Sequence, residues 1–97
     1  MKIITKVVEF DWDIGNLEHI GKHKVETSEC EETFFDTEKV ILKDIQHSEL
    51  EERFILLGQT KDKRLLYLVF TKREQKIRIV SARDINKREV YLYEKAT

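Results

Sequence analysis

The thirty residues from Arg64 to Tyr93 constrain the fold more than any other part of the chain. Two apolar, strand-length segments, Arg64–Lys72 and Lys76–Ala82, are joined by a short polar turn, which is the pattern of a β-hairpin. A helix is expected to follow almost at once, over Ile85–Lys95, with Asp84 as its N-cap. Among the cations of this stretch, those set into the second strand and the helix can face either a phosphate backbone or water: Arg78, Arg83, Lys87 and Arg88.

The preceding part of the chain supplies the elements that such a hairpin can pack against. An apolar strand ends near Phe10 or Trp12, and Asp13 is the expected N-cap of a helix that ends at residues 21–24. Acidic residues just after Ser28 indicate a second helix, which runs to about Phe35. Two further strands complete the set, Val40–Leu42 and Arg53–Gln59.

The predicted order β-α-α-β-β-β-β-α is that of a small α+β domain spanning residues 1–97. We expect an antiparallel meander packed by the N-terminal helices and a C-terminal helix, with the helices on one face of the sheet. Phe34 and Phe35 are expected to pack inward. Gly58 indicates a β-bulge or a close backbone approach.

Composition narrows the class of protein. The longest apolar run, Leu65–Phe70, has the length of a strand and is too short to cross a bilayer. The N-terminus turns acidic and aromatic too early for a signal peptide. The single cysteine, Cys30, excludes an internal disulfide and a cysteine metal cage, and is expected to be a half-buried helix residue. We therefore expect a cytoplasmic protein with no membrane partner.

The net charge of −1 conceals an asymmetry along the chain. Residues 1–60 hold seven Lys/Arg and fourteen Asp/Glu, whereas residues 61–97 hold eleven and five, so the two parts carry −7 and +6. Folding can turn this into a polarised surface, with a basic side suited to nucleic acid and an acidic side suited to a basic partner. It can equally disperse the charges, and the sequence leaves both outcomes open.

Strict alternation along the last strand predicts two unequal faces. The core face would hold Ile77, Ile79, Ser81 and Arg83, and the opposite face Lys76, Arg78, Val80 and Ala82. Arg78 would then project from an open sheet face, where its guanidinium can bind a phosphate bidentately. The alternative is an ion pair with Glu51 or Glu52.

The C-terminal helix and the histidines offer further candidates. Arg88, Tyr91 and Lys95 share a helical face, and either Tyr91 or Tyr93 must pack on the sheet while the other can stack on a base. His19 and His23 have the spacing of a metal pair, but there is no HExxH pattern, so we expect no metal. P-loop, GxSxG and GxGxxG patterns are also absent.

Six segments, in this order and spacing, resemble the BrnT toxin family: FDWD (10–13), NLEHIGKHKV (16–25), EETFFD (31–36), ERFILLGQT (52–60), LLYLVFTKR (65–73) and KIRIVSARDINKREVYLYEK (76–95). The resemblance covers nearly the whole chain. One departure is Lys24, which stands where the family commonly has glycine, in KHGV. Another is the segment NLEHI, where the family more commonly has the pattern N--KH.

The resemblance implies a RelE-like fold and a ribonuclease that inhibits translation by cutting RNA. Such a toxin would be neutralised by BrnA, a ribbon-helix-helix antitoxin that binds DNA, and the complex would repress its own operon. The catalytic candidates carried over from the family are Lys22, His23, Glu52, Arg53, Arg78 and Arg83. The residues expected to bind the RNA substrate are Lys87, Arg88 and Tyr91.

Cleavage by 2′-hydroxyl attack needs a base, a proton for the leaving oxygen and stabilisation of the phosphorane charge, and it needs no metal or cofactor. We expect His23 or Glu52 to be the base, while Arg78 and Arg83 hold the phosphate. Lys22 or Arg88 would contact flanking phosphates or assist proton transfer. The alternative function is a non-catalytic interaction module that retains the fold and acts as the partner or co-repressor of a DNA-binding protein.

Overall fold

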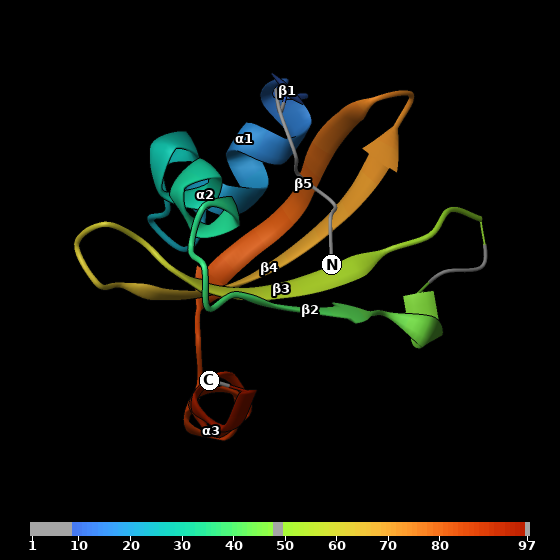
Figure 1. The fold of residues 1–97 in the computed structure, drawn as a ribbon. Coiled ribbons are helices and arrows are strands. Elements are labelled where there is room, and N and C mark those ends of the chain that lie inside the picture. The colour runs from blue at the N-terminus through green and yellow to red at the C-terminus, as the bar shows by residue number, and fades with distance from the viewer. Residues whose placement is uncertain (1–8, 48–49, 97) are drawn as a thin grey trace.

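The computed structural model describes residues 9–47 and 50–96 and confirms the expected α+β class (Figure 1). The elements, in chain order, are β1 (Glu9–Phe10), α1 (Ile14–Gly21), α2 (Thr27–Phe34), β2 (Val40–Lys43), the 3-10 helix η1 (Ile45–His47), β3 (Phe54–Gln59), β4 (Leu65–Arg73), β5 (Lys76–Asp84) and α3 (Lys87–Ala96). The part of the first predicted strand that precedes Glu9 lies outside the described residues.

The strands form one sheet in the order β1-β5-β4-β3-β2. Strands β2 to β5 pair antiparallel with their neighbours, which confirms the predicted meander. Strand β1 adds a parallel edge, in which Phe10 lies opposite Ile77. This pairing brings the start of α1 next to the middle of β5.

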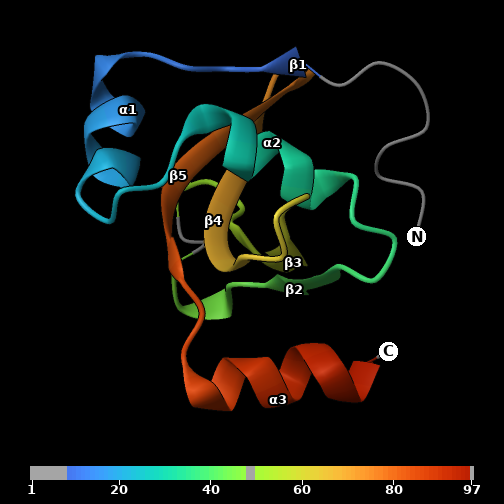
Figure 2. The same cartoon turned by 90° about the vertical axis from the view of Figure 1, so that its left-hand side faces the viewer.

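Helices α1 and α2 cover one side of the sheet, which we call the inner face (Figures 1 and 2). The core lies beneath them, where Phe34 packs edge-to-face on Phe10 and on Phe70 with ring centroids 5.3 and 5.0 Å apart. The other buried apolar residues of this cluster are Ile20, Val25, Cys30, Leu56, Leu66, Leu68, Ile77, Ile79 and Ala82. Burial raises the pKa of the Cys30 thiol to about 12.

Helix α3 lies on the opposite side of the sheet, the outer face, so the prediction that all helices cover one face was wrong (Figure 2). Tyr93 is the tyrosine that packs, and its hydroxyl donates a 2.7 Å hydrogen bond to Asp36 Oδ2. The same carboxylate oxygen accepts the Gln59 backbone N–H at 2.9 Å. Asp36 thereby ties α3 to the end of α2 and to β3. Tyr91 remains exposed.

A β-bulge at Val80 changes the faces of the last strand. Val69 of β4 lies opposite Ser81, but the next residue, Phe70, lies opposite Ile79, so Val80 has no counterpart. The extra residue reverses the alternation beyond it. Ala82 is therefore in the core, whereas strict alternation predicted it on the face of Arg78, and Ser81 and Arg83 move to the outer face.

The N-caps differ from the prediction in two of three helices. Asp13 caps α1 as expected, in a reciprocal capping box with Asn16. Helix α2 begins at Thr27, within the predicted opening Thr27–Glu29, but its cap is a box between Glu26 and Glu29 and not Ser28. Helix α3 begins at Lys87 after Asn86, whose side chain accepts the Glu89 backbone N–H. Asp84 cannot cap this helix because it is the last residue of β5.

Phe35 is exposed, which contradicts the prediction that it packs inward with Phe34. Consecutive residues of a helix point about 100° apart, so only one of the pair reaches the core. The prediction for Gly58 of a close approach was correct. A Cβ on that residue would lie 2.8 Å from Thr33 Cβ and 3.0 Å from Thr33 O.

Candidate functional site on the outer face

The outer face carries its side chains in ladder rows that cross the sheet. One row pairs Arg78 with Thr71, and another pairs Arg83 with Tyr67. Tyr67 and Thr71 are four residues apart in β4, so the two arginines are about 13 Å apart along the sheet. Between these rows lies a mostly apolar row that consists of Ser81, Val69, Ile55 and Leu42.

Arg78 is held at the N-terminus of α1. Its Nη1 and Nη2 donate to the two carboxylate oxygens of Asp13 at 2.9 and 3.1 Å, and Asp11 lies 3.5 Å from Nη1. The hydrogen bond from Arg78 is the main reason that the pKa of Asp13 is lowered. The alternative interpretation, an ion pair, was right in kind but wrong in naming Glu51 or Glu52, because the parallel edge strand β1 brings Asp11 and Asp13 to this guanidinium.

Arg83 lies between a ring and a carboxylate. Its guanidinium carbon is 4.0 Å from the centroid of the Tyr67 ring, and Nη1 and Nη2 each donate to Glu89 at 2.8 Å. This bidentate pair lowers the pKa of Glu89 and raises the pKa of Arg83. Burial is the main cause of the raised pKa of Tyr67. The contact with α3 therefore fixes the orientation of Arg83 on the outer face.

Arg53 is the residue before β3. Its side chain leaves the backbone on the outer face, since the next residue, Phe54, packs against the core. Glu51 bridges Arg53 and Arg73, with nitrogen–oxygen distances of 3.6 and 3.7 Å. Glu52 is more exposed and pairs with Lys43 at 3.1 Å. Its backbone oxygen accepts a 2.6 Å hydrogen bond from the Thr71 hydroxyl, which ties this segment to the row of Arg78.

Lys22 and His23 lie just after α1, where both are exposed. Arg64, which was not predicted as a site residue, organises this segment. Arg64 Nη2 donates to the His23 carbonyl at 3.2 Å, and Arg64 Nε and Nη2 also bind Asp84 at 2.7 and 3.2 Å. Asp84 directly follows Arg83, so Lys22 and His23 belong to the Arg83 end of the sheet. Pairing of the two hairpin strands was the signal that could have found Arg64, because it places residues 64 and 84 close together.

The three substrate-binding candidates are on α3. Lys87 and Arg88 are exposed in its first turn, and Tyr91 is exposed beside Lys95, whose Nζ is 5.7 Å from the ring centroid. That contact agrees with the predicted shared face of Tyr91 and Lys95. These side chains extend the cationic surface beyond Arg83 but are not in the row of Arg78.

The structure thus divides the predicted catalytic residues into two groups. Arg53, Arg78 and Glu52 are at one end of the sheet, and Arg83, Lys22 and His23 are at the other. Among residues 9–47 and 50–96, no three His, Cys, Asp or Glu side chains form a group that could hold a metal ion. None of the described helices is both long and apolar enough to cross a membrane.

Fold and site together define a small α+β protein that presents arginines on the partly open outer face of its sheet. The family model of the ribonuclease toxin BrnT, of type II toxin–antitoxin systems, matches residues 12–89. The match spans 78 of the 97 residues, so the chain belongs to the BrnT family. A toxin–antitoxin family implies an antitoxin partner. No curated protein matched the chain.

Proposed function

We propose that this chain is an endoribonuclease toxin that cleaves RNA on its outer face without a metal and thereby inhibits translation. A BrnA-like ribbon-helix-helix antitoxin would neutralise it and connect it to operator DNA. Family membership supports the reaction class. The observation that carries the choice of surface is the bulge at Val80, which places Arg83 on the same face as Arg78.

The spacing of the two arginines suits a single RNA strand that crosses the sheet. Guanidinium groups about 13 Å apart can contact different phosphates of one strand, while the apolar row between them offers a surface for a base. Each guanidinium has five N–H donors in a planar fork, and its carboxylate partner uses only some of them. Arg78 and Arg83 are therefore oriented by Asp13 and Glu89 while keeping donors for a phosphate.

We place the scissile phosphate at the Arg53 and Arg78 end. A carboxylate there removes the proton from the 2′-hydroxyl, whose oxygen attacks the phosphorus. The bond from phosphorus to the 5′-oxygen then breaks, and this oxygen takes a proton from solvent, which leaves a 2′,3′-cyclic phosphate and a 5′-hydroxyl. Arg53 and Arg78 stabilise the charge that develops on the phosphorane.

Glu51 is better placed than Glu52 to be the base. It lies between two guanidinium groups, whereas the carboxylate of Glu52 is exposed and paired with Lys43. His23, the other predicted base, follows α1 at the Arg83 end of the sheet, away from this phosphate. Glu51→Gln should therefore reduce the cleavage rate more than Glu52→Gln does.

The proposal is tested by incubating purified protein with single-stranded RNA in the presence of EDTA. Cleavage should persist, and the double variant Arg78→Lys/Arg83→Lys, which keeps both charges but loses the planar forks, should cleave at least about 100-fold more slowly. The matched control is Lys39→Ala/Lys63→Ala, which removes two cations elsewhere and should cleave normally. Denaturation curves verify that each variant is folded.

Normal cleavage by the arginine double variant would overturn the assignment of the outer face. Cleavage that EDTA abolishes would overturn the metal-independent mechanism. Folded wild-type protein that binds its antitoxin but cleaves neither naked nor ribosome-bound RNA would support the non-catalytic interaction module instead.

A further inference from the structure

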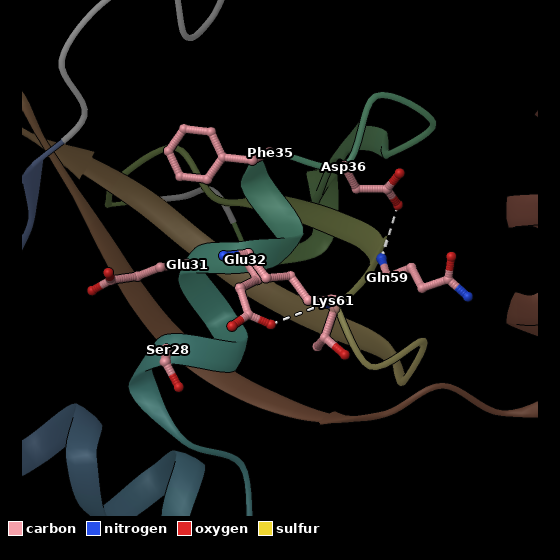
Figure 3. Close-up of a pocket in the computed structure, with 8 residues that line it drawn as sticks. Ser28, Glu31, Glu32, Phe35, Asp36, Gln59 and Lys61 are labelled. Carbon is pink, nitrogen blue, oxygen red and sulfur yellow. Dashed lines mark hydrogen bonds between the residues drawn. The ribbon is translucent and has the colours of Figure 1, made fainter.

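A groove of about 610 Å³ lies away from the arginine rows, between α2 and the turn that joins β3 to β4 (Figure 3). One wall is a single helical face, since Ser28, Glu31 and Phe35 follow one another at intervals of three and four residues. The other wall consists of Gln59, Thr60 and Lys61. Glu32 and Asp36 complete the lining.

The groove combines an exposed aromatic ring with uncompensated acid groups. Phe35 is 63% exposed although it is large and apolar. Glu31, Glu32 and Asp36 make no ion pair with a cation of the described residues, and Lys61 is the only lysine or arginine of the lining. Nearly all the charge that this groove presents is therefore negative.

Hydrogen bonds hold these carboxylates in place without neutralising them. Glu31 Oε2 accepts the indole N–H of Trp12 at 2.8 Å, and Glu32 Oε1 accepts the Lys61 backbone N–H at 3.0 Å. Figure 3 shows the bond from Lys61 to Glu32, together with the bond from Gln59 to Asp36. Each of these donors is neutral, so the charge remains available to a cationic partner.

We propose that this groove docks a basic segment of a partner protein, in which lysines or arginines flank a large apolar side chain. The apolar side chain would pack on Phe35 while the cations pair with Glu31 and Glu32. Charge complementarity selects this occupant and disfavours RNA, whose phosphates the carboxylates repel. The proposal does not depend on RNA cleavage. A candidate for this partner is the antitoxin that family membership implies.

Trp12 is the only tryptophan of the chain, and its hydrogen bond to Glu31 makes it a reporter of the groove. We would titrate the full-length protein with a short peptide that alternates Lys or Arg with Leu. Two control peptides carry Glu in place of the cations, or Ser in place of leucine. The basic apolar peptide should give a saturable change in Trp12 fluorescence that weakens with salt, and neither control should bind.

Substitutions test the aromatic part and the acidic part of the groove independently. Phe35→Ala should weaken binding of the basic apolar peptide at least tenfold, whereas Leu92→Ala, which trims another exposed apolar residue, should not. Glu31→Gln/Glu32→Gln should weaken binding about threefold to tenfold and reduce its salt dependence. These glutamines still accept the two hydrogen bonds, so the fold is retained. The matched control for charge is Glu18→Gln/Glu74→Gln.

Three results would overturn the docking proposal: equal binding of the acidic peptide, unchanged affinity of the Phe35 and Glu31/Glu32 variants, or amide NMR shifts that map to the outer face. RNA cleavage is measured on the same variants and should be unchanged. In the wild-type protein, normal cleavage without binding of the basic apolar peptide would mean that the docking proposal has failed, and peptide binding without cleavage would mean that the proposed function has failed.

Discussion

The inner and outer faces of the sheet are held to their helices in different ways. Beneath α1 and α2 the contacts are apolar, as in the packing of Phe34 on Phe70. On the outer face, directional contacts fix α3, chiefly the pairs Arg83–Glu89 and Tyr93–Asp36. Burial of large apolar side chains contributes more free energy than partly exposed hydrogen bonds and ion pairs. The inner face therefore supplies most of the stability, and the outer face keeps polar groups available to a ligand.

The largest expected effect is the loss of an inner-face ring. Phe34→Ala should lower the free energy of unfolding by about 3–5 kcal/mol, because it removes contacts with Phe10 and Phe70 and leaves a cavity. Phe35→Ala, at the adjacent exposed residue, should change it by less than about 0.5 kcal/mol. Urea denaturation measures both. Similar losses in the two variants would contradict the inward assignment of Phe34 alone.

The inner face was largely predictable because its signal is periodic. Alternation in the hairpin identified Ile77 and Ile79 as core residues, and the strand boundaries differed by only one or two residues. The error at Phe35 arose because the end of α2 determines which of two adjacent phenylalanines turns inward. The cap at Glu26 was not predicted either, because glutamate is not among the residues that most often cap helices.

A second test probes how closely α2 approaches the sheet. Gly58→Ala would place a Cβ 2.8 Å from Thr33 Cβ, and we expect a loss of about 1–3 kcal/mol in the free energy of unfolding. Gly21→Ala is the control, because its Cβ would meet no atom within 4 Å. It should be neutral or stabilise the protein by up to about 1 kcal/mol. A neutral Gly58→Ala would show that α2 can move away from the sheet at little cost.

The outer face was less predictable, because one inserted residue reverses its pattern. Strict alternation assigned Arg83 to the core side, and only the pairing of Phe70 with Ile79 reveals the bulge at Val80. The partner of Arg78 was also hidden, since Asp13 is 65 residues away in the sequence, whereas Glu89 is only six residues after Arg83. The family resemblance found the arginines, but sequence spacing could not show that they share a face.

A third test addresses the ion pair that holds α3. Glu89→Gln should lower the free energy of unfolding by about 1 kcal/mol at pH 7. The lowered pKa of Glu89 means that its contribution is present above the ordinary value of 4.5 and is lost as the pH falls through the folded-state pKa. The difference between wild type and variant should therefore shrink below pH 4.5. A difference that stays constant down to pH 3 would contradict this assignment.

The same variant tests whether the outer-face carboxylate competes with RNA. Replacing Glu89 by glutamine removes the negative charge beside Arg83, so RNA should bind severalfold more tightly, as measured by the KM of cleavage or by fluorescence anisotropy. Glu94→Gln, on the same helix, is the control for a general change of charge. Weaker binding in Glu89→Gln than in this control would show that orientation of Arg83 matters more than competition.

The smallest expected effect is a gain in stability in the loop between α1 and α2. Lys24 has a φ of 57°, in the left-handed region that is unfavourable for a residue with a Cβ. Lys24→Gly should raise the free energy of unfolding by about 0.5–1 kcal/mol, since the Lys24 carbonyl still accepts the 3.0 Å hydrogen bond from Arg64. Lys22→Gly, at a φ of −59°, should instead be destabilising. If both variants lose stability, the lysine side chain contributes more free energy at residue 24 than the backbone strain costs.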